Sequence, residues 1–233
     1  HMAFEGNPGT CKTTMARAVA KLYQENSIVS NGFYEFGRED LVGRYLGETS
    51  QKVSKLFKMA NGGVIFIDEF GAIVSDATGD SYGMEALNAI VRHMENNSDT
   101  MVIIATYPSE LQKILSINPG LQSRFSKIIN FPDYTQDELL NIFITEKNGY
   151  SIEKGYEYIV LNYFEKSRKN KNFGNGREAR KLFETSVAEL SLELFKNKSK
   201  EIDTLTISAI TNAVISLTKN NKDEKKLRIG FSV

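Results

Sequence analysis

The residues with the clearest chemical potential form a glycine-rich loop near the N-terminus. The stretch runs Gly6-Asn7-Pro8-Gly9-Thr10-Cys11-Lys12-Thr13-Thr14, between a short apolar run and a helical pattern. The backbone N–H groups of such a loop can wrap phosphates at the positive N-terminus of the following helix. Lys12 would then reach the β- and γ-phosphates as a point charge, and the Thr13 hydroxyl would hold Mg²⁺. The alternative is a tight turn that opens a surface helix.

Two adjacent carboxylates, Asp68 and Glu69, follow the apolar run Val64–Ile67. A continuous apolar run is typical of a strand buried on both faces of a parallel sheet, and ligands bind at the carboxyl ends of such strands. Asp68 would position Mg²⁺ and its waters, whereas Glu69 would polarise a water for attack on the γ-phosphate. The alternative is a solvated acid pair that caps the next helix. The loop and the acid pair together predict a P-loop fold that binds ATP with Mg²⁺.

Strands that alternate with helices must position these residues. Helical spacing begins directly after the loop, and the later apolar runs are rich in β-branched and aromatic residues. The predicted helices are 13–25, 50–59 and 84–95, and the predicted strands are 33–36, 64–67, 101–105 and 127–131. This order predicts an α/β domain over residues 1–132, a doubly wound P-loop parallel sheet.

The pattern changes after Pro132. Turn and cap residues at 133–138 begin a helix, and further helical patterns follow at about 152–167, 177–195 and 205–217 with no strand run between them. Residues 133–219 therefore predict a small all-helical lid domain. Residues 220–233 are predicted to be a polar tail, frayed over Lys219–Lys226.

Composition excludes several classes of protein. Lys and Arg number 29, as do Asp and Glu, so no global field favours nucleic acid or an anionic membrane. No run approaches the roughly 20 apolar residues of a membrane span, so we expect a cytoplasmic protein. The single cysteine excludes an internal disulfide and a four-cysteine zinc site.

His93, on an apolar helical pattern, is expected to be structural or solvated. His1-Met2 is typical of a cloning scar, so we expect a fragment of a longer protein.

On these motifs the chain resembles the AAA+ ATPases, in particular the branch of the red-type Rubisco activases and the stage V sporulation protein K-like proteins. The resemblance extends from Gly6 to about Leu190 and includes four further blocks, Leu41–Thr49, Tyr82–Ala86, Asn118–Phe125 and Asn172–Arg177. It implies ATP-hydrolysing homo-oligomers, hexameric rings that bind ATP between subunits and pull protein substrates through a central pore.

The resemblance also implies roles for individual residues. Tyr45-Leu46-Gly47 matches the pore loop, in which an exposed aromatic can grip an unfolded chain; the alternative is a loop aromatic folded onto the core. Arg124 matches the arginine finger, which acts on the neighbouring subunit's γ-phosphate, and would otherwise be an ordinary surface arginine. Arg177 matches the second sensor, which would clamp the lid to the core. The first sensor should be a polar residue at the end of the strand 101–105, and we assign it to Thr106 rather than Tyr107.

Cys11 stands where the family usually has glycine. The backbone there tends toward positive φ and passes close to the phosphates, so a side chain at this position puts tight nucleotide binding in doubt. We also expect oxidation or alkylation of this thiol to block ATP binding.

Three functions are therefore open. The leading one is an ATP-hydrolysing, ring-forming remodeller of protein substrates. The second is a regulatory or assembly module that binds nucleotide weakly because of Cys11. The third is a DNA-handling ATPase, against which zero net charge and the Tyr45–Gly47 motif count.

Overall fold

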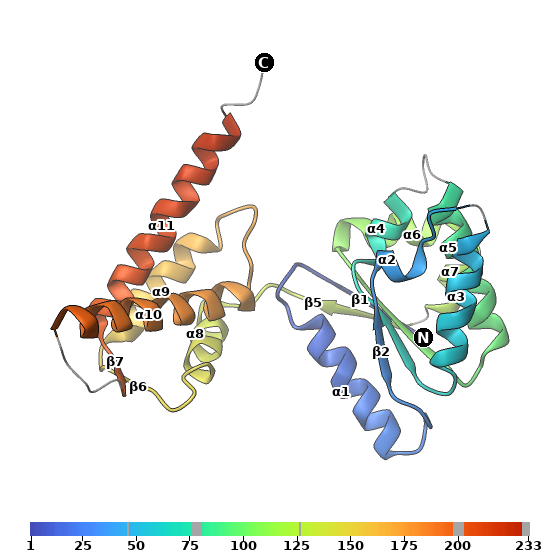
Figure 1. The fold of residues 1–233 in the computed structure, drawn as a ribbon, viewed down its shortest axis with the longest axis horizontal. Coiled ribbons are helices and arrows are strands. Elements are labelled where there is room, and N and C mark those ends of the chain that lie inside the picture. The colour runs from blue at the N-terminus through green and yellow to red at the C-terminus, as the bar shows by residue number, and fades with distance from the viewer. Residues whose placement is uncertain (46, 76–80, 126, 198–202, 230–233) are drawn as a thin grey trace. The chain divides into compact units, whose positions relative to one another are not determined.

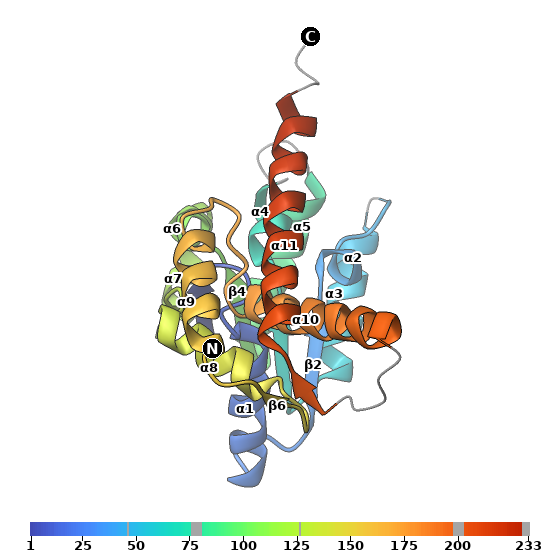
Figure 2. The ribbon, with the colours of Figure 1, turned by 90° about the vertical axis from the view of Figure 1, so that its left-hand side faces the viewer.

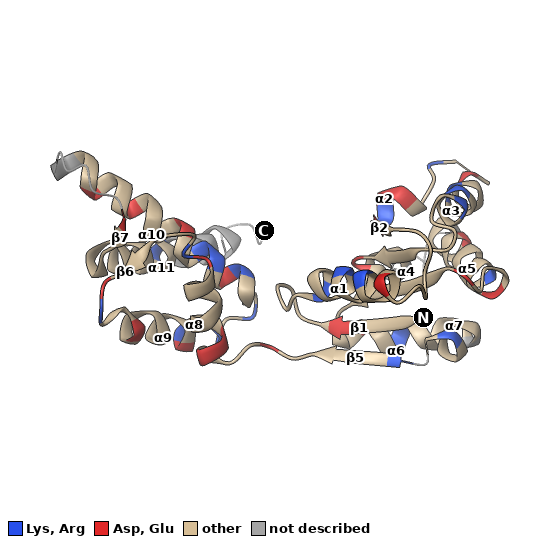
Figure 3. Ribbon diagram, turned by 90° about the horizontal axis from the view of Figure 1, so that it is seen from below, with Lys and Arg blue, Asp and Glu red and all other residues tan. Residues whose placement is uncertain are grey.

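The computed structural model describes residues 1–45, 47–75, 81–125, 127–197 and 203–229 (Figure 1). The chain divides into two compact units, His1–Pro132 and Asp133–Val233. Both units carry Lys and Arg as well as Asp and Glu on their helices (Figure 3). Within the described ranges, no helix combines the length and the apolar character needed to cross a membrane.

The first unit is built on one five-stranded sheet in the order β2-β3-β4-β1-β5. Every neighbouring pair of strands is parallel, so all five carboxyl ends lie at the same edge of the sheet. This arrangement confirms the predicted doubly wound parallel sheet. The strands are β1 (Met2–Gly6), β2 (Phe33–Phe36), β3 (Val64–Ile67), β4 (Met101–Thr106) and β5 (Lys127–Phe131).

Helices cover both faces of this sheet. Alternate residues of β3 show the two layers, because Ile65 and Ile67 belong to one buried cluster whereas Val64 and Phe66 belong to another. Helix α1 covers the Phe66 face, and the remaining long helices cover the other (Figure 1). The helices are α1 (Lys12–Glu25), α2 (Arg38–Leu41), α3 (Glu48–Met59), α4 (Phe70–Ser75), α5 (Ser81–Asn96), α6 (Pro108–Ile117) and α7 (Pro119–Arg124).

The second unit is helical, as predicted. Its helices are α8 (Gln136–Thr145), α9 (Tyr156–Ser167), α10 (Gly176–Asn197) and α11 (Ile207–Ile229). Thr135 and Glu138 form a reciprocal capping box at the start of α8. The sequence analysis missed one pair of short parallel strands, β6 (Ser151–Ile152) and β7 (Thr204–Leu205), which are too short for a periodicity to register.

The prediction that Lys219–Lys226 are frayed is wrong, because these residues are helical. Helix α11 continues to Ile229, and its last turns extend beyond the other helices of this unit (Figures 1 and 2). Residues 222–228 are Lys, Asp, Glu, Leu and Arg, mostly good helix formers, and the next glycine is Gly230. High polarity alone was therefore a poor reason to predict fraying.

Candidate functional site

The glycine-rich loop connects β1 to α1 and has a left-handed backbone at two positions. Gly9 has a φ of 75° and Cys11, the N-cap of α1, has a φ of 62°. The sequence-based expectation of positive φ at Cys11 is therefore confirmed, and a non-glycine residue in this conformation costs about 1 kcal/mol. The Thr10 hydroxyl, which is buried, donates to the Asn7 carbonyl at 2.8 Å and closes the loop.

Lys12 turns its side chain back over the same loop. Its Nζ donates to the carbonyl oxygens of Gly6 and Asn7, at 2.8 and 2.9 Å. Thr13 and Thr14 follow in the first turn of α1, Thr13 half-buried and Thr14 exposed. An ammonium, a hydroxyl and the helix N-terminus thus converge on one loop, a donor set that fits a polyphosphate.

The acid pair follows β3 directly. The backbone N–H of Asp68 donates to the Phe36 carbonyl at 3.1 Å, which extends the β2–β3 pairing to the carboxylate. Asp68 Oδ1 accepts from the Glu69 backbone N–H at 2.9 Å. Glu69 has a φ of 47°, a strained value for a non-glycine residue, and its carbonyl accepts from the Ala72 N–H at 2.8 Å. Its side chain is exposed.

The loop and the acid pair lie at the same edge of the sheet, which confirms the expected placement. Only β4 separates β1 from β3, so the two segments start about 10 Å apart. The intervening strand ends at Thr106, which pairs in register with Glu5 of β1. Thr106 is 2% exposed, and its Oγ1 donates to Oε2 of Glu110 at 3.0 Å. The sequence analysis did not identify Glu110, because a single glutamate in a helix gives no pattern.

Two residues at this edge, Thr13 and Asp68, could hold Mg²⁺ by their side-chain oxygens. No group of three or more His, Cys, Asp or Glu side chains with metal-binding geometry occurs in the part of the chain that the structure describes. Thr13 and Asp68 would supply two oxygen ligands, and Mg²⁺ commonly takes the rest of its octahedron from substrate phosphates and water.

The loop before α3 contains Tyr45 and is called the aromatic loop below. The Tyr45 side chain is 75% exposed, so the alternative that its ring folds onto the core is wrong. Gly47, the N-cap of α3, has a φ of 77°, which favours glycine. Leu46, the middle residue of the predicted pore loop, lies outside the described residues.

Two side chains at the start of α3 brace this aromatic loop. Glu48 Oε2 accepts from the backbone N–H groups of Arg44 and Tyr45, at 2.8 and 3.3 Å. Buried Thr49 accepts from the Gly43 N–H at 2.9 Å. The Arg44 hydrogen bond is the main reason why the pKa of Glu48 lies below its ordinary value.

Arg124 ends α7 and is held by its own chain. Its Nη2 lies 3.1 Å from Oε1 of Glu95, and its Nη1 donates to the Gly120 carbonyl at 3.0 Å. Its side chain is 22% exposed, so it is not a free surface arginine. Because Arg124 precedes β5 by three residues, it lies toward the amino ends of the strands, at the opposite edge from the glycine-rich loop.

Arg177 belongs to the second unit and is exposed in the first turn of α10. The helix start is fixed by Asn175, which is fully buried with a φ of 50°. Asn175 Nδ2 donates to Oδ1 of Asp133 at 2.9 Å, and its Oδ1 accepts from the Tyr134 N–H at 3.0 Å. Asn175 thus joins the start of α10 to the first residues of the same unit, a role that the sequence analysis did not detect.

His93 has a structural environment, as expected. Its ring stacks on Phe57 with ring centroids 4.9 Å apart, and Asn97 Nδ2 lies 3.2 Å from its Nδ1. Burial is the main cause that lowers the pKa of His93, so the folded state favours the neutral ring.

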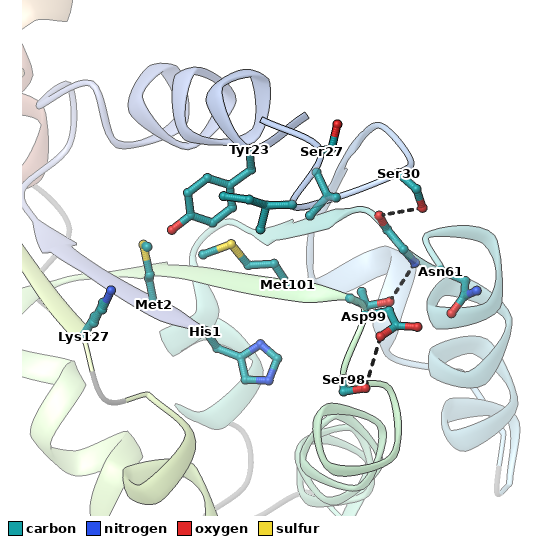
Figure 4. A pocket seen from close by; sticks show the side chains of 14 residues that line it. His1, Met2, Tyr23, Ser27, Ser30, Asn61, Ser98, Asp99, Met101 and Lys127 are labelled. Atoms are coloured by element: carbon teal, nitrogen blue, oxygen red, sulfur yellow. Dashed lines mark hydrogen bonds between the residues drawn. The ribbon is translucent and has the colours of Figure 1, made fainter. Parts of the chain in front are cut away.

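A hollow of about 560 Å³ lies at the other edge of the sheet (Figure 4). Met2, Met101 and Lys127, the first residues of β1, β4 and β5, line it together with Tyr23 and other residues of the neighbouring loops. It is therefore separate from the glycine-rich loop, and it contains none of the residues predicted to do chemistry.

Several known proteins are similar to this chain in sequence or in fold. Residues 2–133 match the ATPase family associated with various cellular activities (AAA), and residues 135–220 match the AAA lid domain. Stage V sporulation protein K of Bacillus subtilis is 38% identical over 83% of this chain, which covers 62% of that protein.

One further relative is similar in sequence, and one solved structure is similar in fold. The chloroplastic ribulose bisphosphate carboxylase/oxygenase activase of Cyanidioschyzon merolae is 36% identical over 90% of this chain and 74% of that protein. The crystal structure of the FIGL-1 AAA domain matches 92% of this chain and 70% of that one, with a TM-score of 0.66 and 18% identity. The structural likeness supports the fold alone.

Proposed function

Because this chain belongs to the ATPase family associated with various cellular activities, we propose that it hydrolyses ATP with Mg²⁺ as part of a ring-forming motor that remodels proteins. The observation that carries this proposal is the common edge of the sheet. The glycine-rich loop, the acid pair and a polar strand end meet there across three adjacent strands.

Each residue at this edge has a separate proposed role in binding or hydrolysis. Lys12 would exchange its bonds to the Gly6 and Asn7 carbonyls for the β- and γ-phosphates, and Thr13 and Asp68 would hold the metal. Bound ATP with Mg²⁺ supplies a phosphoanhydride bond whose γ-phosphoryl group water can attack. Glu69 would accept a proton from that water, and Thr106 would orient it. The remaining residues of the loop between Asn7 and Thr14 would also contact the phosphates.

The position of Arg124 supports assembly into a ring. It lies toward the opposite edge from the loop of its own subunit, which supports a role at the γ-phosphate of a neighbouring copy. Arg177 of the lid would contact the nucleotide in its own subunit. The family relationship supports a homo-oligomer, and we propose a hexamer.

The aromatic loop supports a protein substrate. Tyr45 is exposed on a braced loop, which suits apolar contact with an unfolded segment without reading its sequence. The activase from Cyanidioschyzon merolae acts, by its name, on an enzyme, which supports a protein rather than a nucleic acid as the substrate here.

Steady-state phosphate release tests the proposal. We expect Mg²⁺-dependent hydrolysis of ATP, a loss of at least about a hundredfold in kcat for Glu69→Gln, and retained binding of a fluorescent ATP analogue by that variant. Lys12→Ala should lose binding itself. Hydrolysis that Glu69→Gln leaves unchanged would contradict the assignment.

A second function is favoured by one observation. Cys11 occupies the left-handed position with a φ of 62°, where a side chain is strained and would lie close to bound phosphates. The chain could therefore be a regulatory or assembly module that binds nucleotide weakly. Nucleotide affinity too weak to saturate at millimolar ATP, restored by Cys11→Gly, would favour this module over the motor.

A further inference from the structure

A carboxylate at the site has no role in the proposed function. Glu110 lies in the first turn of α6 and is half-buried. Its Oε2 accepts from the Thr106 hydroxyl at 3.0 Å, at the end of the central strand between the loop and the acid pair. The proposed first sensor is therefore held by a second residue.

This hydrogen bond fixes what the Thr106 hydroxyl can do. A threonine hydroxyl has one proton to donate and two lone pairs, whereas a carboxylate only accepts. Because the proton of Thr106 is committed to Glu110, its Oγ1 can form a further hydrogen bond only as an acceptor. An acceptor at this position suits a water molecule, which donates its protons, and does not suit a phosphate oxygen, which has none to donate.

Glu110 also lies against the segment that carries the acid pair. A Cβ placed on Gly71 would collide with the Glu110 carboxylate, at 2.6 Å from its Cδ. Gly71 follows Glu69 by two residues, inside the turn closed by the Ala72 N–H to Glu69 carbonyl bond. One carboxylate thus lies against both the strand end at Thr106 and the turn at Glu69, and a side chain at position 71 would have to displace it.

We propose that Glu110 is a positioning residue for ATP hydrolysis, which sets the Thr106 hydroxyl as an acceptor for the attacking water. This inference rests on the proposed function. One proton of the water would point to Thr106 and the other to Glu69, so that a lone pair of the water oxygen faces the phosphorus. When the water attacks, Glu69 takes its proton and the bond to the ADP oxygen breaks.

A purely structural role for Glu110 makes different predictions. An acidic residue in the first turn also interacts with the helix dipole, so its removal would lower stability whatever Thr106 does. A positioning role instead lowers kcat, leaves nucleotide affinity nearly unchanged, and disappears when the Thr106 hydroxyl is absent.

A double-mutant cycle separates these roles. Phosphate release and fluorescent-ATP binding are measured for Glu110→Ala, Thr106→Val and the double variant, with the exposed neighbour Ser109→Ala as control. We expect each single variant to lose about tenfold or more in kcat, with affinity changed less than about threefold. The double variant should lose no more than Thr106→Val alone. Losses that multiply would overturn the proposal.

Two further variants keep the test decisive if Glu110→Ala folds poorly. Glu110→Gln retains an acceptor oxygen, so we expect it to keep most of kcat. Gly71→Ala favours the helix but must displace the carboxylate, so it should lower kcat in the wild-type background and have no effect beside Glu110→Ala. Equal kcat for Gly71→Ala and wild type would count against the proposal.

The same measurements distinguish the two levels of inference. If the wild type shows no phosphate release that depends on Glu69, the proposed function fails and this inference fails with it. If the wild type hydrolyses ATP through Glu69 and Glu110→Ala matches it in kcat, only the role of Glu110 is refuted.

Discussion

Two residues of the site, Cys11 and Glu69, hold a left-handed backbone that residues other than glycine seldom adopt. The first could be predicted, because the loop pattern shows where glycine is usual. The second could not, because the strain at Glu69 arises from the turn between β3 and α4, which leaves no mark on residue type. Glu110 could not be predicted either, because a single glutamate in a helix gives no pattern.

The strain at Cys11 leads to a prediction about affinity. Cys11→Gly should strengthen nucleotide binding by up to about fivefold, because glycine removes the Cβ and Sγ from this position and, with them, a cost of about 1 kcal/mol when the loop closes on the phosphates. Cys11→Ala is the matched control, since it keeps the Cβ and removes the thiol. Titration with a fluorescent ATP analogue measures all three proteins, and equal affinities would show that the loop accepts this side chain freely.

The exposed thiol allows a second test on the same residue. Cys11 is the only cysteine of the chain, so an alkylating reagent modifies one defined position. A bulky adduct at this position should block nucleotide binding, whereas the Cys11→Gly protein should be insensitive to the reagent. Unchanged binding after complete alkylation, verified by mass spectrometry, would place the side chain outside the phosphate path.

At the scale of elements, the aromatic loop should depend on pH. The pKa of Glu48 is lowered in the folded state, chiefly by the Arg44 backbone hydrogen bond, so the ionised carboxylate favours the braced loop. This contribution is present above the ordinary pKa of 4.5 and is lost as the pH falls through the lowered value. Protection of the Arg44 and Tyr45 amides from hydrogen exchange, corrected for intrinsic rates, should fall in that range. Glu48→Gln should show weaker protection with no such transition.

The start of α10 provides a prediction about stability. Asn175→Ala removes two buried hydrogen bonds and places alanine at a φ of 50°, so it should lower the free energy of unfolding of the second unit by about 2–4 kcal/mol. Asn175→Gly tolerates the backbone conformation and should cost less. Urea unfolding measures both, with the exposed Asn172→Ala as control. Equal stability of the Ala and Gly variants would show that the left-handed backbone contributes nothing.

The long elements were more predictable than the short ones. Helices α1, α3, α5 and α10 repeat apolar residues at helical spacing over several turns, and the buried strands are continuous apolar runs. Helices α4 and α7, of six residues each, give too short a pattern, and the ion pair between Arg124 and Glu95 joins elements that only the tertiary fold brings together.

At the scale of the whole molecule, the position of Arg124 predicts complementation between subunits. Arg124→Ala and Glu69→Gln should each be nearly inactive alone. A mixture should regain part of the activity, because a Glu69→Gln subunit can offer its intact Arg124 to the intact Glu69 of its neighbour. The control mixes Arg124→Ala with the double variant Arg124→Ala/Glu69→Gln. This mixture contains no intact Arg124, so it cannot form a complete site and should stay inactive. Phosphate release measures this, and a mixture no better than its components would mean that Arg124 does not act across subunits.

The two carbonyls that hold the Lys12 ammonium also bear on which anions the loop accepts. An entering ligand must compete with the chain's own oxygens for this cation, and each bond that it displaces reduces its net affinity. Inorganic phosphate or a nucleoside monophosphate has little charge to offer in exchange, whereas a di- or triphosphate can repay the loss at several oxygens. We therefore expect the loop to select for the length of the phosphate chain before any contact with the base is made.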